Sequence, residues 1–100
     1  MWWKERDCCM IDLGGINLLG INLKKINLER INLERANFEK TNLTGANLKE
    51  TNVEEANLRG ALNLSIDQLS KVRALYNVKL DGEFLIQLKE KFPFLLFKVI

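Results

Sequence analysis

Few side chains in this chain could carry out catalysis. The 100-residue sequence contains no histidine, and its two serines, Ser65 and Ser70, fall in a segment patterned as a helix. Nucleophilic and acid–base catalysis need a positioned base beside a nucleophile. Asp12 with Glu34 or Glu54 could form a carboxylate cluster, but charged side chains on a solvated surface explain the same residues. We therefore predict a non-enzymatic protein with no catalytic residue and no cofactor.

Cys8 and Cys9 are the other side chains with chemical potential. They are adjacent, so they lack the C-x-x-C spacing, and neighbouring cysteines rarely form a disulfide. A reduced thiol pair in the cytoplasm is the simpler interpretation. A reactive or metal-linked pair is the alternative, but without histidine a metal would lack ligands. We predict a cytoplasmic protein with no metal site, and the redox role of the pair stays open.

The charge pattern argues against nucleic acid and membrane. The net charge is +2, and residues 11–60 carry seven basic and seven acidic side chains, so the excess lies in residues 61–100. A nucleic-acid binder usually has a basic face, and a nucleic-acid mimic is strongly acidic. No apolar run approaches the roughly 20 residues that span a bilayer. We expect neither a nucleic-acid partner nor a membrane span.

A five-residue repeat organises residues 11–60. Ten units follow one another, from IDLGG to ANLRG. The first position is Ile in five units and then Ala or Thr; the second is Asp12 and then Asn nine times. The third is Leu except at Phe38 and Val53. A repeat at a fixed period decides the architecture before the propensity of any one residue.

Neither a helix nor a straight strand explains this period. In a helix, a step of five residues rotates the pattern by about 140°, which spreads the leucines around the cylinder. In a strand, an odd period sends alternate leucines to opposite faces. Asn favours turns, where it adopts the left-handed conformation and bonds its own backbone. The repeat therefore predicts a solenoid with a bend in every unit.

The motif resembles the pentapeptide repeat family, whose pattern is A-(D/N)-L-x-x. The resemblance implies a mainly β fold: a right-handed quadrilateral β-helix with four units in each coil, about 2.5 coils in all. Positions one and three would lie inside. The expected structural core is then the third position of each unit: Leu13, Leu18, Leu23, Leu28, Leu33, Phe38, Leu43, Leu48, Val53 and Leu58.

Stacking of units four apart can be tested within the sequence. The inner columns are then apolar or Thr throughout. The outer columns give one like-charged pair, Glu34 over Glu54, and four opposite pairs. These are Glu29 over Lys49, Arg30 over Glu50, Arg35 over Glu55 and Glu39 over Arg59. Exposed pairs contribute only about 0–1 kcal/mol each, so they support the register more than the stability.

The ends of the repeat differ from its middle. Residues 1–10 are expected to be an N-terminal cap, with residues 6–10 as a degenerate repeat and Trp2 and Trp3 as a plug over the first coil in preference to a binding site. Residues 61–100 are expected to be a helical cap with an apolar tail, similar to the tail of many bacterial pentapeptide proteins. Ser65 and Gln68 predict a capping box. One helix should run from Ile66 to about Tyr76 and another over about 83–92. The predicted cap residues are Ser65, Gln68, Leu69 and Val72.

The last residues form an apolar stretch that we single out as a candidate interface. It could fold back over the second helix, form a homodimer seam, or contact a membrane. The candidate residues are Phe94, Leu95, Leu96, Phe97, Val99 and Ile100.

The function class that the sequence favours is a structural or protein–protein interaction module with an unidentified protein partner. Its contact surface would be the charged residues of units four to ten. Some pentapeptide repeat proteins imitate duplex DNA and bind gyrase or topoisomerase. The neutral repeat region and the short length disfavour this alternative. A third possibility is that the chain is one domain of a larger protein.

Overall fold

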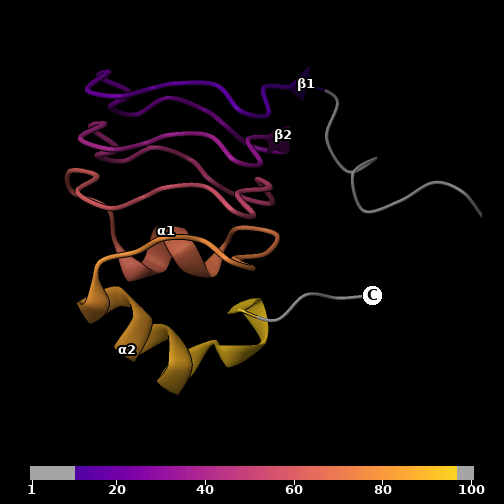
Figure 1. The fold of residues 1–100 in the computed structure, drawn as a ribbon, viewed down its shortest axis with the longest axis vertical. Helices are drawn as coiled ribbons and strands as arrows, with labels where there is room; N and C mark the ends of the chain where they lie inside the picture. The colour runs from indigo at the N-terminus through magenta and orange to yellow at the C-terminus, as the bar shows by residue number, and fades with distance from the viewer. Residues whose placement is uncertain (1–10, 97–100) are drawn as a thin grey trace, which may run out of the picture.

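The computed structural model describes residues 11–96, which stack in layers along one axis (Figure 1). Strand β1 (Ile11–Asp12) pairs in parallel with β2 (Ile31–Asn32), and Ile11 lies opposite Ile31. Single parallel bridges continue the same 20-residue spacing, as between Asn37 and Asn57. Residues 11–30 thus form the first layer and residues 31–50 the second, with four units in each. This is the stacking that the sequence columns predict.

A regular ladder of backbone hydrogen bonds joins the layers. The N–H of Leu18, at position three, donates to the carbonyl of Asn37 in the next layer (2.8 Å). The N–H of Asn37 donates in turn to the carbonyl of Ile16 (2.9 Å). Both backbone groups of a position-two residue therefore face the preceding layer.

Each unit closes with the same corner. The Asn or Asp side chain at position two accepts a hydrogen bond from the N–H at position four, as Asn37 does from Glu39 (3.0 Å). The carbonyl at position three accepts from the first N–H of the next unit, as Phe38 does from Thr41 (3.0 Å). Position five then has positive φ in all ten units. The residues are Gly15, Gly20, Lys25, Arg30, Arg35, Lys40, Gly45, Glu50, Glu55 and Gly60.

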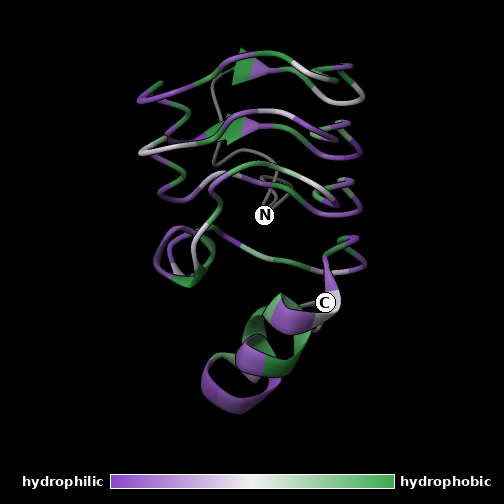
Figure 2. Ribbon diagram, turned by 90° about the vertical axis from the view of Figure 1, so that its left-hand side faces the viewer, coloured by the Kyte–Doolittle hydropathy of each residue, from purple (hydrophilic) through white to green (hydrophobic). Residues whose placement is uncertain are grey.

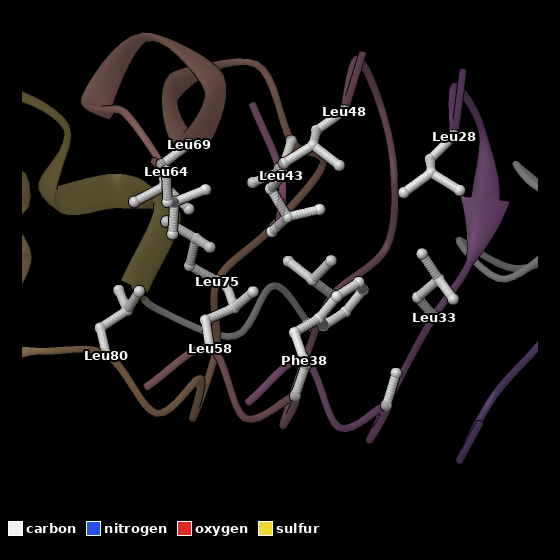
Figure 3. Close-up of a cluster of buried hydrophobic side chains, with 14 of the residues drawn as sticks. Leu28, Leu33, Phe38, Leu43, Leu48, Leu58, Leu64, Leu69, Leu75 and Leu80 are labelled. Atoms are coloured by element: carbon white, nitrogen blue, oxygen red, sulfur yellow. The ribbon is translucent and has the colours of Figure 1, made fainter. Parts of the chain in front are cut away.

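The apolar side chains at positions one and three fill the inside of the layers. Figure 3 shows the leucines and Phe38 converging on one interior, and Figure 2 shows apolar and polar residues alternating along each layer. Leu33, Phe38 and Leu43 are fully buried. The buried position-one residues Thr41 and Thr51 donate their hydroxyls to the carbonyls of Leu18 (2.6 Å) and Leu28 (2.8 Å). Because these hydroxyls are bonded, their burial carries little penalty.

The pairing between layers continues past Gly60, where the sequence repeat stops. Leu62 pairs with Asn42 at the usual spacing, but Ala74 pairs with Asn52 and Lys79 with Asn57, each 22 residues on. Helix α1 (Ile66–Ser70) occupies the longer stretch between them.

The expectation that the first helix runs to about Tyr76 is therefore wrong. The chain returns to the ladder after Ser70, with Arg73 N–H donating to Thr51 O (3.0 Å) and Lys79 N–H to Ala56 O (2.9 Å). Leu75 is fully buried in the interior of the layers. Pairing with an existing edge satisfies the backbone and buries this leucine, so it outweighs further helix growth.

The second helix and the chain after it close the C-terminal end. Helix α2 (Gly82–Lys91) lies close to the range expected, and Pro93 opens a short 3₁₀ helix, η2 (Pro93–Leu96). Both lie below the last layer in Figure 1. The N–H of Leu75 donates to Leu95 O (2.6 Å), so η2 supplies an acceptor that a further layer would otherwise provide.

Several expectations fall outside the described residues. They concern the degenerate repeat at residues 6–10, the plug of Trp2 and Trp3, and the thiol pair of Cys8 and Cys9. The tail residues Phe97, Val99 and Ile100 lie outside as well.

The corner geometry predicts opposite effects for one substitution at two neighbouring lysines. Lys25, at position five, has φ of 59°, whereas Lys24 has no positive φ. We expect Lys25→Gly to raise the free energy of unfolding by about 0.5–1 kcal/mol, because glycine has no Cβ to strain the left-handed conformation. Lys24→Gly should lower it by about 0.5–1 kcal/mol. Urea denaturation measures both, and equal changes in the two variants would contradict this account of the corner.

Candidate protein-binding surface

One side of the solenoid departs from the repeat, because α1 replaces a strand there. This side, which we name the helix side, consists of residues 26–30, residues 46–50 and α1 with Lys71. Gln68 Nε2 donates to Leu43 O (2.8 Å) and Ala46 O (3.0 Å). The N–H of Glu50 donates to Lys71 O (2.8 Å). A side-chain amide and the helix end therefore take over bonds that a strand would make.

The start of α1 depends on the same glutamine. Gln68 N–H donates to Ser65 Oγ (3.1 Å), and Ser65 N–H donates to Gln68 Oε1 (2.9 Å), which completes a capping box. The two ends of the Gln68 amide thus bind the helix start and the solenoid. Leu69 and Val72 are buried beneath. The four cap residues singled out from the sequence all lie at this junction.

Three hollows border the helix side. The first, of about 380 Å³, lies between the second layer and α1 and is lined by Gly45, Ala46, Asn47, Leu48, Asn63, Ser65, Asp67, Gln68 and Lys71. A second, of about 450 Å³, is lined by Asn47, Lys49, Glu50 and Lys71. The third, of about 280 Å³, lies nearer the N-terminal end of the solenoid and is lined by Ile11, Asn27, Glu29, Arg30 and Ile31.

The charged groups of the helix side are partly paired. Arg30 forms an ion pair with Glu50 (3.5 Å), and Lys71 forms one with Asp67 (3.3 Å). The expected pair of Glu29 and Lys49 is not formed among residues 11–96, and Glu29 instead accepts from Asn47 Nδ2 (3.3 Å). Lys49 is exposed.

The neighbouring corner adds positive charge to this side. Lys24 and Lys25 lie there, one unit before the helix side, and both are exposed. Counting them, the surface carries two more basic than acidic side chains. The basic ones are Lys24, Lys25, Arg30, Lys49 and Lys71, and the acidic ones are Glu29, Glu50 and Asp67. An acidic segment of a partner would complement this surface.

The corner that ends the unit of residues 31–35 stacks on the corner of residues 51–55. It is rich in acidic side chains, and one arginine pairs with them. Arg35 Nε donates to Glu55 Oε1 (2.9 Å). The hydrogen bond with Glu55, then the charges of Glu55 and Glu34, raise the pKa of Arg35 above its usual value. Arg35 thus offsets the negative charges of Glu55 and Glu34. The fourth expected pair, Glu39 with Arg59, forms no ion pair within the described chain.

The predicted core residues differ in burial from one layer to the next. Leu13, Leu18 and Leu23 of the first layer are only partly buried. The seven others are buried: Leu28, Leu33, Phe38, Leu43, Leu48, Val53 and Leu58.

The apolar tail divides between core and surface. Leu95 is buried and Leu96 is partly buried against the core, so the expectation of an interface at Leu95 is corrected, because its side chain closes the end of the solenoid. Phe94 is 65% exposed and meets Phe92 edge to face, with the ring centroids 6.5 Å apart. Of the described tail residues, Phe94 alone offers a large exposed side chain.

Residues 11–96 show no group of three or more acidic, Cys or His side chains that could hold a metal ion. Nor does that range include a helix of the length and hydrophobicity needed to cross a bilayer.

The stacked layers and their parallel bridges define a β-solenoid protein. Residues 21–60 match the family model of pentapeptide repeats, with eight copies. Residues 21–60 are therefore pentapeptide repeats. A comparison with curated proteins finds no matching sequence.

Solved structures of QnrB1 show a distant similarity to this chain. QnrB1 is a plasmid-mediated fluoroquinolone resistance protein. One trypsin-treated variant is 22% identical over 89% of this chain and 45% of its own, with a TM-score of 0.29. Another is 21% identical over 87% of this chain and 47% of its own, also with a TM-score of 0.29. The chain thus spans about half the length of these proteins.

The helix side was not predicted from the sequence, because the repeat motif ends at Gly60 and the residues after it were expected to form a separate cap. A signal was present in the leucine spacing. Leu64 and Leu69 lie five residues apart, as do Leu75 and Leu80, and all four are buried. Asn77 also has positive φ (55°), as a position-five residue would.

The double role of Gln68 predicts a large loss on its removal. Gln68→Ala should lower the free energy of unfolding by about 2–3 kcal/mol, because it leaves Ala46 O without its donor and removes half of the capping box. Gln87→Ala, at an exposed position in α2, should change it by less than about 0.5 kcal/mol. Thermal and urea denaturation measure both variants. Similar small effects would show that the amide does not hold α1 to the layers.

Proposed function

We propose that this chain is a non-enzymatic protein-binding module and that the helix side is its contact surface. The observation that carries the proposal is the hollow of about 380 Å³ between α1 and the second layer. It lies where the repeat is interrupted and is lined by the exposed Lys71, which also lines a second hollow together with Lys49. An interruption that leaves polar and charged groups around a hollow is suited to receive side chains of a partner.

The scaffold supports binding because it holds this surface in one conformation. The hydrogen bonds of the ladder and the ten corners fix the backbone of residues 26–30 and 46–50. No buried side-chain polar atom in the described chain lacks a hydrogen-bond partner. A surface that is ordered before binding loses little conformational entropy when a partner arrives.

The charge of the helix side favours an acidic segment as the ligand. By itself the helix side carries three basic and three acidic side chains, and the neighbouring corner of Lys24 and Lys25 gives the combined surface its excess of two basic side chains. A carboxylate of the partner would pair with Lys49, for which the structure shows no ion pair among residues 11–96. Such a pair on a partly exposed rim contributes mainly to association rate and specificity.

The remaining parts of the proposal concern fold detail and location. The family match supports a right-handed, four-sided β-helix with about 2.5 coils over residues 11–60. Residues 1–10 would form the N-terminal cap and residues 61–100 the C-terminal one, in a cytoplasmic protein. The pairing of Ala74 and Lys79 with the third layer makes part of the C-terminal cap a continuation of the solenoid.

Imitation of duplex DNA is not favoured. A mimic needs continuous negative potential along one face. Here positive side chains interrupt the corner columns, as the ion pairs Arg30–Glu50 and Arg35–Glu55 show. Added in excess to a gyrase supercoiling assay, the chain is expected to leave the rate of supercoiling unchanged. Inhibition or protection would revive this alternative.

The binding proposal is tested by charge reversal on two opposite sides. Lys49→Glu with Lys71→Glu changes the helix side, and Lys40→Glu with Lys79→Glu makes the same change elsewhere. Lys79 pairs with the unit of residues 56–60, two units on from residues 46–50, and therefore lies on the opposite side. We expect proteins that bind the unmodified chain to bind the Lys40 and Lys79 variant equally and the helix-side variant at least about tenfold more weakly.

A photo-crosslinking amino acid placed at position 49 or 79 provides the second measurement. Cross-links to a partner should form from position 49 and not from position 79. Equal cross-linking from both positions, or equal weakening by both charge reversals, would contradict the assignment of the helix side.

A further inference from the structure

The two ends of the solenoid are finished differently. The C-terminal end is covered by α2 and η2, with Leu88 and Leu95 buried. At the N-terminal end, Ile11 is 53% exposed, Ile21 46% and Ile26 37%. These isoleucines occupy position one, which is buried in the second layer at Ala36, Thr41 and Ala46. The first layer therefore presents an open apolar interior.

Its backbone is open as well. Position-two residues bond the preceding layer through both backbone groups, as Asn37 does with Leu18 and Ile16. In the first layer the same groups belong to Asn17, Asn22 and Asn27, and no backbone hydrogen bond within residues 11–96 uses them. An unpaired edge of this kind is a template for pairing with another strand.

We propose that a second copy of this chain covers this end, with the two first layers facing each other across a two-fold axis. Facing strands are then antiparallel, and opposed position-two residues can exchange two hydrogen bonds per pair. Position one of one copy lies opposite position three of the other. Because both positions point inward, the apolar interior continues across the interface.

The rise of the chain from one layer to the next allows only one position for the two-fold axis. Ile31 lies directly beneath Ile11, so the end surface is a ramp with one step of about 4.8 Å. The step falls at the corner of Glu29 and Arg30. Two such ramps fit with even spacing only when the two-fold axis passes through the step corner and the corner diagonally opposite. Asn22 then faces Asn17 of the second copy, and Asn27 faces Asp12.

The charges of the first layer agree with this axis. The corner of Lys24 and Lys25 lies opposite the corner of Gly14 and Gly15 of the second copy, next to the carboxylate of Asp12. An axis through the other diagonal would place the lysines on each other, and like charges at that distance repel. At the step corner, Glu29 approaches Arg30 of the second copy.

The arrangement also accounts for Gly14. Position four is occupied by a side chain in the nine other units, from Leu19 to Arg59. Gly14 has no positive φ, but a Cβ at this position would lie 3.2 Å from Asp12 Oδ1, so the space within the corner also favours glycine. A corner without side chains leaves room for Lys24 and Lys25 of the facing copy.

The ten residues before Ile11 are the competing occupant. A second copy covers all four sides together, and the step corner leaves an exit for the chain that precedes Ile11.

The test is a matched pair of substitutions at Gly14 in the full chain. Gly14→Lys and Gly14→Glu add side chains of similar length and opposite charge, at a position that holds Lys or Glu in other units. Sedimentation equilibrium should show a dimer for the unmodified chain and for Gly14→Glu. The dissociation constant of Gly14→Lys should be at least about tenfold higher. Adding Lys24→Glu and Lys25→Glu to Gly14→Lys should restore the dimer.

Hydrogen exchange at the amides of Asn17, Asn22 and Asn27 identifies the occupant, and protection should rise with protein concentration. A monomer whose Asn22 and Asn27 amides are protected would overturn the proposal in favour of residues 1–10. A monomer without protection would overturn it too. So would a dimer that Gly14→Lys leaves intact and Phe94→Ser breaks, or equal loss of the dimer in both Gly14 variants.

Discussion

The hydrogen bond from a position-four N–H to the side chain at position two is the interaction on which the solenoid depends. Its donor–acceptor distance is 2.9–3.1 Å in the ten units. The strands between corners are too short to fix a direction alone, since β1 and β2 have two residues each. Because the position-two side chain closes every corner in the same way, each five-residue unit starts with its side chains in the same orientation as the unit before it. Positions one and three can then always point inward.

A helix can replace a strand in this hydrogen-bonded ladder only if it supplies the hydrogen bonds to the preceding layer that the strand would have made. Helix α1 meets this condition through one residue. The Gln68 amide caps the helix and serves Leu43 O and Ala46 O, while Lys71 O receives the N–H of Glu50. Leu62 lies 20 residues after its partner Asn42, and Ala74 lies 22 residues after its partner Asn52. The stretch that contains the helix is therefore only two residues longer than a regular one.

The sequence predicts the stacked part of the fold well because one rule acts at every unit. The columns of leucines and the pair of Arg35 and Glu55 both follow from stacking units four apart. Three features escaped prediction for physical reasons. The residues from Lys71 to about Tyr76 were expected to continue the first helix, but their backbone pairs with the edge of the preceding layer instead. Glu29 prefers the amide of Asn47 over Lys49, a choice between neighbours that charge alone cannot settle. The hollow between α1 and the second layer lies where a helix takes the place of a strand, and no single residue in the sequence predicts that replacement.

The gradient of burial along the axis has a consequence for how the molecule comes apart. Each layer contacts only its neighbours, so the stability of the stack resembles a row of coupled units. Leu13 and Leu18 in the first layer are partly exposed, whereas Leu33, Leu43 and Leu75 are fully buried. In a single copy, opening should therefore start at the first layer and proceed layer by layer toward the C-terminal end. The layer held by Gln68 and Leu95 would be the last to release.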